Sequence, residues 1–89
     1  MNCELDKLTT SQRRLFEAIK KHETKTGRFC GAPKPSHMGM SQLKGYDTGI
    51  TICTGFQKRT FWELVDRKII TQTMFCGYRL SDSYHTSNQ

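Results

Sequence analysis

The stretch GFQKRTFWELVDRKIITQTMFCGYRL, residues 55–80, decides the fold that we expect for this chain. Apolar residues recur at helical spacing through its first half, which predicts a helix from Gly55 to Arg67. The second half has a β-rich run from Ile69 to Phe75, a turn at Cys76-Gly77 and a return through Tyr78 to Leu80, which predicts a β-hairpin. A helix followed at once by a hairpin is typical of DNA-binding domains that pack a hairpin beside their third helix.

Two more helices are predicted before this stretch. The amphipathic pattern from Leu8 to Thr26 predicts the longer one, which Thr9 or Thr10 caps and Gly27 ends. A shorter helix is expected from about Ser36 to Leu43.

The segments between the helices are predicted from their prolines, glycines and β-branched residues. Residues Arg28 to Pro35 are expected to form a connector, in which Phe29 and Cys30 make a short extended piece that pairs with a later strand. Gly49 to Cys53 is predicted as a short strand or an extended loop. This order predicts an α+β winged helix-turn-helix domain over residues 1–81, with three helices and a small β-hairpin wing, and a flexible polar tail at residues 82–89.

The composition indicates one basic domain. The chain has 89 residues, with fourteen Lys and Arg against eight Asp and Glu, a net charge of +6 and a sequence pI of about 9.4. Excess positive charge attracts polyanions, and nucleic acid is the leading candidate. No apolar run approaches the roughly 20 residues of a membrane span, and Met1 to Lys7 is too polar to begin a signal peptide. We therefore expect a cytoplasmic protein without membrane contact.

Four cysteines, at positions 3, 30, 53 and 76, are spaced too widely for a C-x-x-C metal motif. We expect free, partly buried thiols and no cofactor. A scattered zinc site is the alternative, which would use Cys30, Cys53 or Cys76 with His22 or His37. Because no Cys-His or Ser-His-Asp signature and no glycine-rich phosphate loop is present, we expect a protein that is not an enzyme.

Two sequence patterns, one at each end of the expected domain, carry a family resemblance. The first is Leu8-Thr9-x-x-Gln12-x-x-x-Phe16-x-x-Ile19-x-x-His22-x-x-x-Thr26-Gly27, and the second is Leu64-x-x-Arg67-Lys68-x-Ile70 followed by Gly77-Tyr78-Arg79-Leu80. Together they resemble the N-terminal DNA-binding domain of LexA-type repressors. The resemblance implies a winged-helix fold. Residues 28–54 and the front of the expected third helix depart from the family. The chain also ends where such repressors continue into a self-cleaving domain. We therefore carry over neither the operator sequence nor self-cleavage.

The expected function is sequence-specific binding of duplex DNA by a small transcriptional regulator. In a helix-turn-helix domain the N-terminal residues of the third helix lie nearest the bases. Arg and Lys donate to guanine, Gln pairs with adenine and Thr contacts the thymine methyl group. The expected DNA-contact residues are Gln57, Lys58, Arg59, Thr60, Glu63, Arg67 and Lys68 on or after this helix, Arg79 on the hairpin, and Arg13 and Arg14 on the first helix. A solvated helix face is the alternative interpretation of the same basic run.

Two further questions stay open at this point. The alternative function is a winged-helix protein-interaction module, an inhibitor or accessory subunit of a nucleic-acid machine of the kind found in phages and mobile elements. Trp62 and Tyr46 would then contact the partner, because aromatic residues are enriched in binding hot spots. A homodimer on a two-fold DNA site is compatible with the leading hypothesis. The turn from Met74 to Gly77 is uncharged, so we do not expect it to insert deeply as a basic wing.

Overall fold

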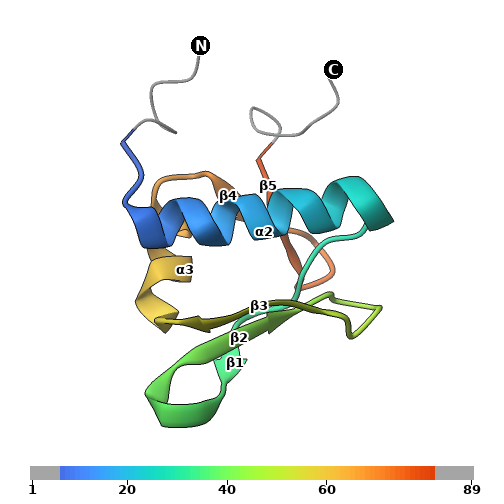
Figure 1. Cartoon of the computed structure of the whole chain (residues 1–89). Helices are drawn as coiled ribbons and strands as arrows, with labels where there is room; N and C mark the ends of the chain where they lie inside the picture. The colour runs from blue at the N-terminus through green and yellow to red at the C-terminus, as the bar shows by residue number, and fades with distance from the viewer. Residues whose placement is uncertain (1–6, 82–89) are drawn as a thin grey trace.

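The computed structural model describes residues 7–81 of the chain, in which two α-helices pack against two small antiparallel sheets (Figure 1). The elements in chain order are α2 (Thr10–Thr26), β1 (Lys34–Pro35), the 3₁₀ helix η1 (His37–Gly39), β2 (Ser41–Lys44), β3 (Thr51–Phe56), α3 (Lys58–Asp66), β4 (Ile70–Gln72) and β5 (Tyr78–Leu80). The expected polar tail at residues 82–89 lies outside the described residues.

Helix α2 forms for the local reasons that its sequence predicts. Thr9 is its N-cap: the Thr9 hydroxyl accepts from the Gln12 backbone N–H, and the Gln12 side chain accepts from the Thr9 backbone N–H. Gly27 ends the helix in the left-handed conformation, with φ of 68°. The side chains that α2 buries are Gln12, Leu15, Phe16, Ile19 and His22. The predicted first helix is therefore confirmed, with its start at Thr10.

Cys30 joins the two sheets. Strands β1, β2 and β3 form an antiparallel meander, and β4 and β5 form a separate hairpin. The backbone of Cys30 bridges to Gly45 on one side and to Tyr78 of β5 on the other. The Cys30 N–H donates to the Tyr78 carbonyl over 2.8 Å, and the Tyr78 N–H donates back over 2.6 Å. This pairing confirms the prediction that Phe29 and Cys30 form an extended piece joined to a later strand.

The predicted helix from Ser36 to Leu43 is wrong. Apart from the single turn η1, this segment forms strand β2, which pairs with β3 through Leu43 and Cys53. Ser41 and Leu43 are buried and the residue between them is less so, which is the two-residue alternation of a strand. The chain is α+β, but the expected three-helix winged helix-turn-helix is wrong, because residues 7–81 contain two α-helices and five strands.

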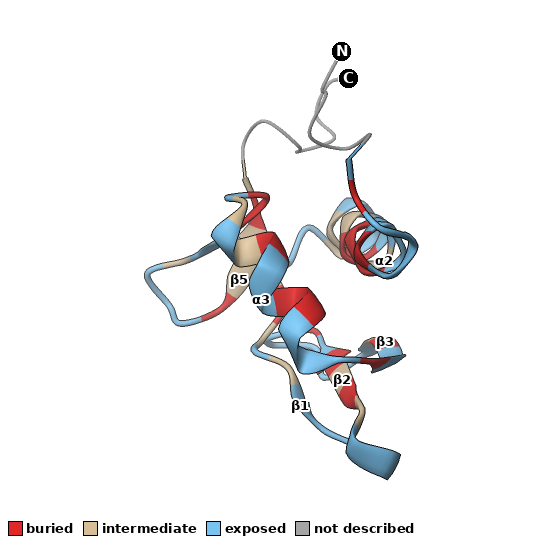
Figure 2. Ribbon diagram, turned by 90° about the vertical axis from the view of Figure 1, so that its left-hand side faces the viewer, coloured by how far each residue is buried: buried red, intermediate tan, exposed pale blue. Residues whose placement is uncertain are grey.

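The helix predicted from Gly55 to Arg67 is present but begins later. Gly55 has φ of 71° and lies within β3, and Gln57 is the N-cap of α3 without a side-chain hydrogen bond. Figure 2 shows α3 with an exposed outward side, α2 seen end-on beside it, and β1 and β2 below. The hairpin of β4 and β5 is present as predicted. The core between these elements contains Leu8, Leu15, Phe16, Ile19, Cys30, Leu43, Cys53, Phe56, Phe61, Leu64, Ile69, Ile70 and Leu80.

Candidate nucleic-acid interface

The first turn of α3 presents three of the expected DNA-contact residues to solvent and buries a fourth. Gln57, Lys58 and Arg59 are exposed. Thr60 is only 6% exposed and packs with Phe61 toward the core. Because α3 begins at Lys58, the face of the helix that packs on the core includes residue 60 as well as Phe61 and Leu64. Thr60 therefore does not present its methyl group to a ligand, and the available surface of this turn is Gln57, Lys58 and Arg59.

Two further predicted contact residues tie α3 to α2. The Gln12 side-chain amide donates to Glu63 Oε1 over 2.8 Å. Arg67 Nη1 donates to Gln12 Oε1 over 3.2 Å, and the same oxygen accepts the Thr9 backbone N–H. Gln12 is buried, so this network fixes the angle and height of α3 against the first turn of α2. Glu63 and Arg67 are thus positioning residues. The helical pattern placed Gln12 on the buried face, but it gave no sign of these partners.

Arg14, Lys58 and Arg59 form the group that we call the α3 cluster. Arg14 and Arg59 line a groove of about 360 Å³ between the first turns of both helices and the end of β3, near Gln57 and Glu63. Lys58 lines a neighbouring groove of about 220 Å³ against the β1–β2 hairpin. Arg14 is oriented by a bond from its Nη2 to the Thr54 carbonyl, at 3.2 Å.

The α3 cluster has an unbalanced positive charge. For residues 7–81 the structure records no ion pair that involves Arg14, Lys58 or Arg59. Neither helix has an acidic residue in its first turn. The N-terminal end of a helix itself carries a partial positive charge, and two such ends face this groove. Glu63 is the nearby carboxylate, and it is hydrogen-bonded to Gln12. The groove therefore favours an anionic ligand.

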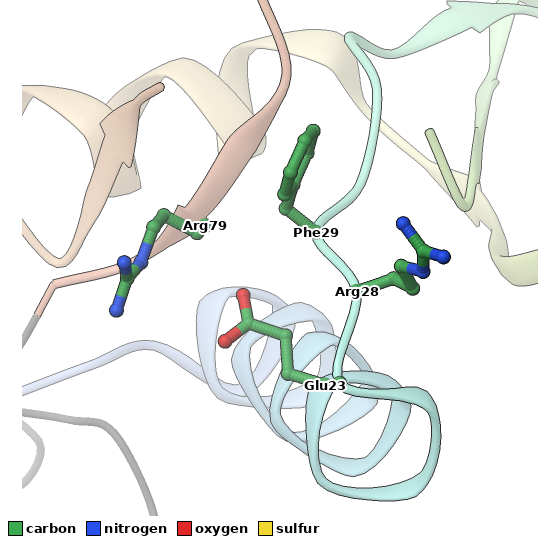
Figure 3. Close-up of a pocket in the computed structure, with 5 residues that line it drawn as sticks. Glu23, Arg28, Phe29 and Arg79 are labelled. Atoms are coloured by element: carbon green, nitrogen blue, oxygen red, sulfur yellow. The ribbon is translucent and has the colours of Figure 1, made fainter. Parts of the chain in front are cut away.

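Arg79 lies in a different place, together with Arg28, and we call this pair the β5 cluster. Both line a pocket of about 150 Å³ with Glu23 and Phe29, between the last turn of α2 and β5 (Figure 3). Arg28 Nη1 forms an ion pair with Asp47 Oδ2 at 3.0 Å. Glu23 Oε2 accepts the Leu80 backbone N–H over 2.8 Å, which satisfies an edge group of β5. Both cations of the β5 cluster therefore have a carboxylate nearby: Asp47 pairs with Arg28, and Glu23 lines the same pocket as Arg79.

The remaining predicted contact residues are not in either groove. Arg13 is exposed on α2 beside Arg14, and it does not line the groove that Arg14 and Arg59 share. Lys68 is exposed after the C-terminal end of α3, with φ of 63°. The structure therefore brings together Gln57, Arg59 and Arg14, places Lys58 next to them, and separates Arg79 and Lys68 from this group.

The two aromatic residues of the alternative hypothesis lie in separate aromatic contacts. Trp62 is 36% exposed and packs edge-on against Phe61 and Tyr78, with ring centroids 5.0 and 5.6 Å away. Tyr46 packs against Phe29, with centroids 4.9 Å apart. Trp62 therefore contacts the β4–β5 hairpin, and each ring has its own partners within the fold.

Burial shifts the pKa values of two thiols and of one histidine. Burial, with a smaller contribution from Glu23, raises the pKa of the Cys30 thiol to about 12. Burial also raises the pKa of Cys53 and lowers that of His22. Cys76 is exposed in the β4–β5 turn. No group of three or more His, Cys, Asp or Glu side chains within residues 7–81 is arranged to hold a metal ion.

Comparisons with known proteins add no relative. No protein-family model, no curated protein and no solved structure matches the chain, so the resemblance to LexA-type repressors rests on the quoted residues. In the part of the chain that the structure describes, no helix has the length and apolar character needed to cross a membrane.

Proposed function

We propose that this protein binds duplex DNA through the first turn of α3 and acts as a small sequence-specific transcriptional regulator in the cytoplasm. The observation that carries the proposal is the α3 cluster: Arg14, Lys58 and Arg59 gather at two helix N-termini and form no ion pair with any other residue in the range 7–81. Free thiols at Cys30 and Cys53 agree with a reducing compartment.

The dimensions of α3 suit the major groove. An α-helix with its side chains is about 10–12 Å across, and the major groove is about 12 Å wide. With the N-terminal end of α3 toward the bases, Arg59 and Lys58 can donate to guanine O6 and N7, and Gln57 can pair with adenine. Arg14, whose guanidinium donates to the Thr54 carbonyl and lines the same groove, could then contact a phosphate.

The alternative is an accessory or inhibitory subunit that binds a protein through Trp62 and Tyr46. Its support is the partial exposure of Trp62. We rank it second, because Trp62 and Tyr46 belong to separate aromatic contacts, whereas three cations without an ion pair within residues 7–81 gather in the α3 cluster.

The proposal is tested by fluorescence anisotropy with a labelled duplex at several salt concentrations. If the three residues of the α3 cluster each neutralise about one phosphate, the logarithm of the binding constant should fall against log salt with a slope of about −2 to −3. The double substitution Lys58→Ala and Arg59→Ala should flatten this slope by about 2 and weaken binding.

The matched control is the double substitution Lys21→Ala and Lys25→Ala, which removes the same charge from exposed positions toward the other end of α2. It should keep the slope of the wild type. Absence of duplex binding at low salt would overturn the proposal, as would an equal loss of affinity in the two double variants.

A further inference from the structure

The tip of the β1–β2 hairpin presents an unpacked methionine. Met38 is 95% exposed, the most exposed of the large hydrophobic side chains in the described chain. Its φ of 58° is in the left-handed region, which a residue with a long side chain rarely adopts. A strained backbone that holds an apolar side chain in water is a reason to look for a function at that residue.

The tip is held in one conformation by its own hydrogen bonds. The Met40 N–H donates to the His37 carbonyl over 3.0 Å, and the Ser36 N–H donates to the Met40 carbonyl over 2.8 Å. Pro35 pairs with Ser41 at the base of the turn, and its ring fixes its own φ. Met38 is therefore presented by an ordered turn, which lowers the entropic cost of using it in a contact.

The tip lies on the same side of the molecule as α3. Both are toward the left in Figure 1, and in Figure 2 α3 lies in front with the β1–β2 hairpin extending below it. Lys58 of the α3 cluster lines the groove formed by the hairpin residues Pro35, Ser36, Gly39 and Met40. The apolar tip thus continues the surface that carries the proposed DNA contacts.

The charge around the tip is positive. No Asp or Glu occurs between Glu23 and Asp47, whereas Lys34 and Lys44 are exposed on the hairpin itself. This hairpin is therefore complementary to a polyanion, and the same charge disfavours contact with a second copy of the chain.

We infer that Met38 is an apolar wedge that inserts between base pairs of the minor groove next to the major groove occupied by α3, and that it bends the duplex. The inference rests on the proposed function. Adjacent major and minor grooves are about 17 Å apart along the helix axis, half of one DNA turn, and the β1–β2 hairpin extends away from α3 in Figure 2. Apolar residues flanked by cations are the side chains that unstack base steps in this way, and the flanking lysines here would contact phosphates.

The experiment measures bending and affinity on the same sample. A random-sequence duplex of about 30 bp, labelled with a donor and an acceptor at its two ends, reports bending by energy transfer and binding by anisotropy. The test variant is Met38→Ala. The matched control is Met74→Ala, which removes the same side chain from the exposed turn of the other hairpin, where Met74 is 89% exposed.

Wild type and Met74→Ala should bring the ends of the duplex closer, by the equivalent of a bend of about 20–90°. Met38→Ala should bind within about tenfold of wild type and lose the bend. Met38→Phe should keep it, because a phenyl ring also wedges between bases. Wild-type binding without a bend, or an unchanged bend in Met38→Ala, would overturn the proposal that Met38 is a wedge. Neither result would contradict the proposal that the protein binds duplex DNA. Absence of wild-type binding would overturn both proposals.

Discussion

The two basic clusters of this protein lie toward opposite ends of α2, a helix about 25 Å long, and they differ in their carboxylates. In the β5 cluster, Arg28 is paired with Asp47 and Arg79 lies across a pocket from Glu23. In the α3 cluster the cations have no recorded ion pair within residues 7–81, and the nearby Glu63 is bonded to Gln12. Net charge alone therefore does not locate a site for an anion; the α3 cluster is distinguished because three cations without an ion pair within residues 7–81 gather at two helix N-terminal ends.

The largest expected effect comes from disturbing the side of the molecule that carries the β5 cluster. A Cβ at Gly77 would lie 2.2 Å from Cδ2 of Phe29, so Gly77→Ala should push the Phe29 ring from the hairpin. We expect a loss of about 1–3 kcal/mol in the free energy of unfolding, measured by denaturant titration. Gly31→Ala is the control, because its Cβ would meet only a backbone oxygen at 3.9 Å.

Gly77→Ala also separates the two clusters functionally. The folded variant should bind duplex DNA as the wild type does, because the α3 cluster lies away from Phe29. A parallel loss of affinity at protein concentrations and temperatures where the variant is folded would show that the β5 cluster participates in binding.

The next effect is expected at the link between the helices. Gln12→Ala removes the acceptor of Arg67 and of the Thr9 backbone N–H, together with the donor to Glu63, which should cost about 1–2 kcal/mol of stability. It should also weaken duplex binding, because α3 loses the bonds that set its orientation. Ser11→Ala, at the exposed neighbouring position, is the control for the stability measurement only, because Ser11 also lines the groove of the α3 cluster. If Gln12→Ala bound DNA as tightly as wild type, the network would be structural only.

The smallest effect concerns pH. His22 is buried, and burial lowers its pKa below 6.5, so the unfolded chain binds more protons between the folded pKa and 6.5. The stability contributed by neutral His22 is fully present above pH 6.5 and is lost as pH falls toward the folded pKa. The loss is at most about 1.4 kcal/mol for each pH unit of that window.

The pH effect is measured by comparing the Tm about one pH unit above and about one below 6.5. Wild type should lose more stability on acidification than His22→Gln does, and the exposed control His37→Gln should match the wild type. An identical pH dependence in wild type and His22→Gln would remove His22 from this account.

The sequence predicted the parts of the fold that local patterns determine. Helix α2 is specified by its N-cap residue, its apolar face and its terminal glycine, all of which can be found within its own sequence. The β4–β5 hairpin is specified by its two β-rich strands. Strand β2 was missed because its reason is not local: Leu43 is buried only when the strand pairs with β3, ten residues later. Gly39, in the middle of the predicted helix, has φ of 75° and was the available signal against that helix.

The sequence also predicted only part of the candidate site. The run Gln57 to Arg59 was found from its residue types, and the structure exposes it. The burial of Thr60 depends on where α3 begins, which local patterns fix poorly. The Gln12 network joins residues 51 and 55 positions apart, so no spacing rule could find it. The separation of Arg79 from the α3 cluster likewise follows only from the packing of β5 beside the end of α2.

The most direct test of the central claim compares one arginine from each cluster. The affinity of a single labelled duplex is measured at low salt for Arg59→Ala and for Arg28→Ala, with the wild type alongside. Loss of Arg59 should weaken binding by about tenfold or more, which corresponds to about 1.4 kcal/mol, because Arg59 has no ion pair within residues 7–81 and its charge is available for the proposed DNA contact. Loss of Arg28 should change the affinity by less than about twofold, since Asp47 already neutralises it. Equal losses in the two variants, or a larger loss for Arg28→Ala, would contradict the account.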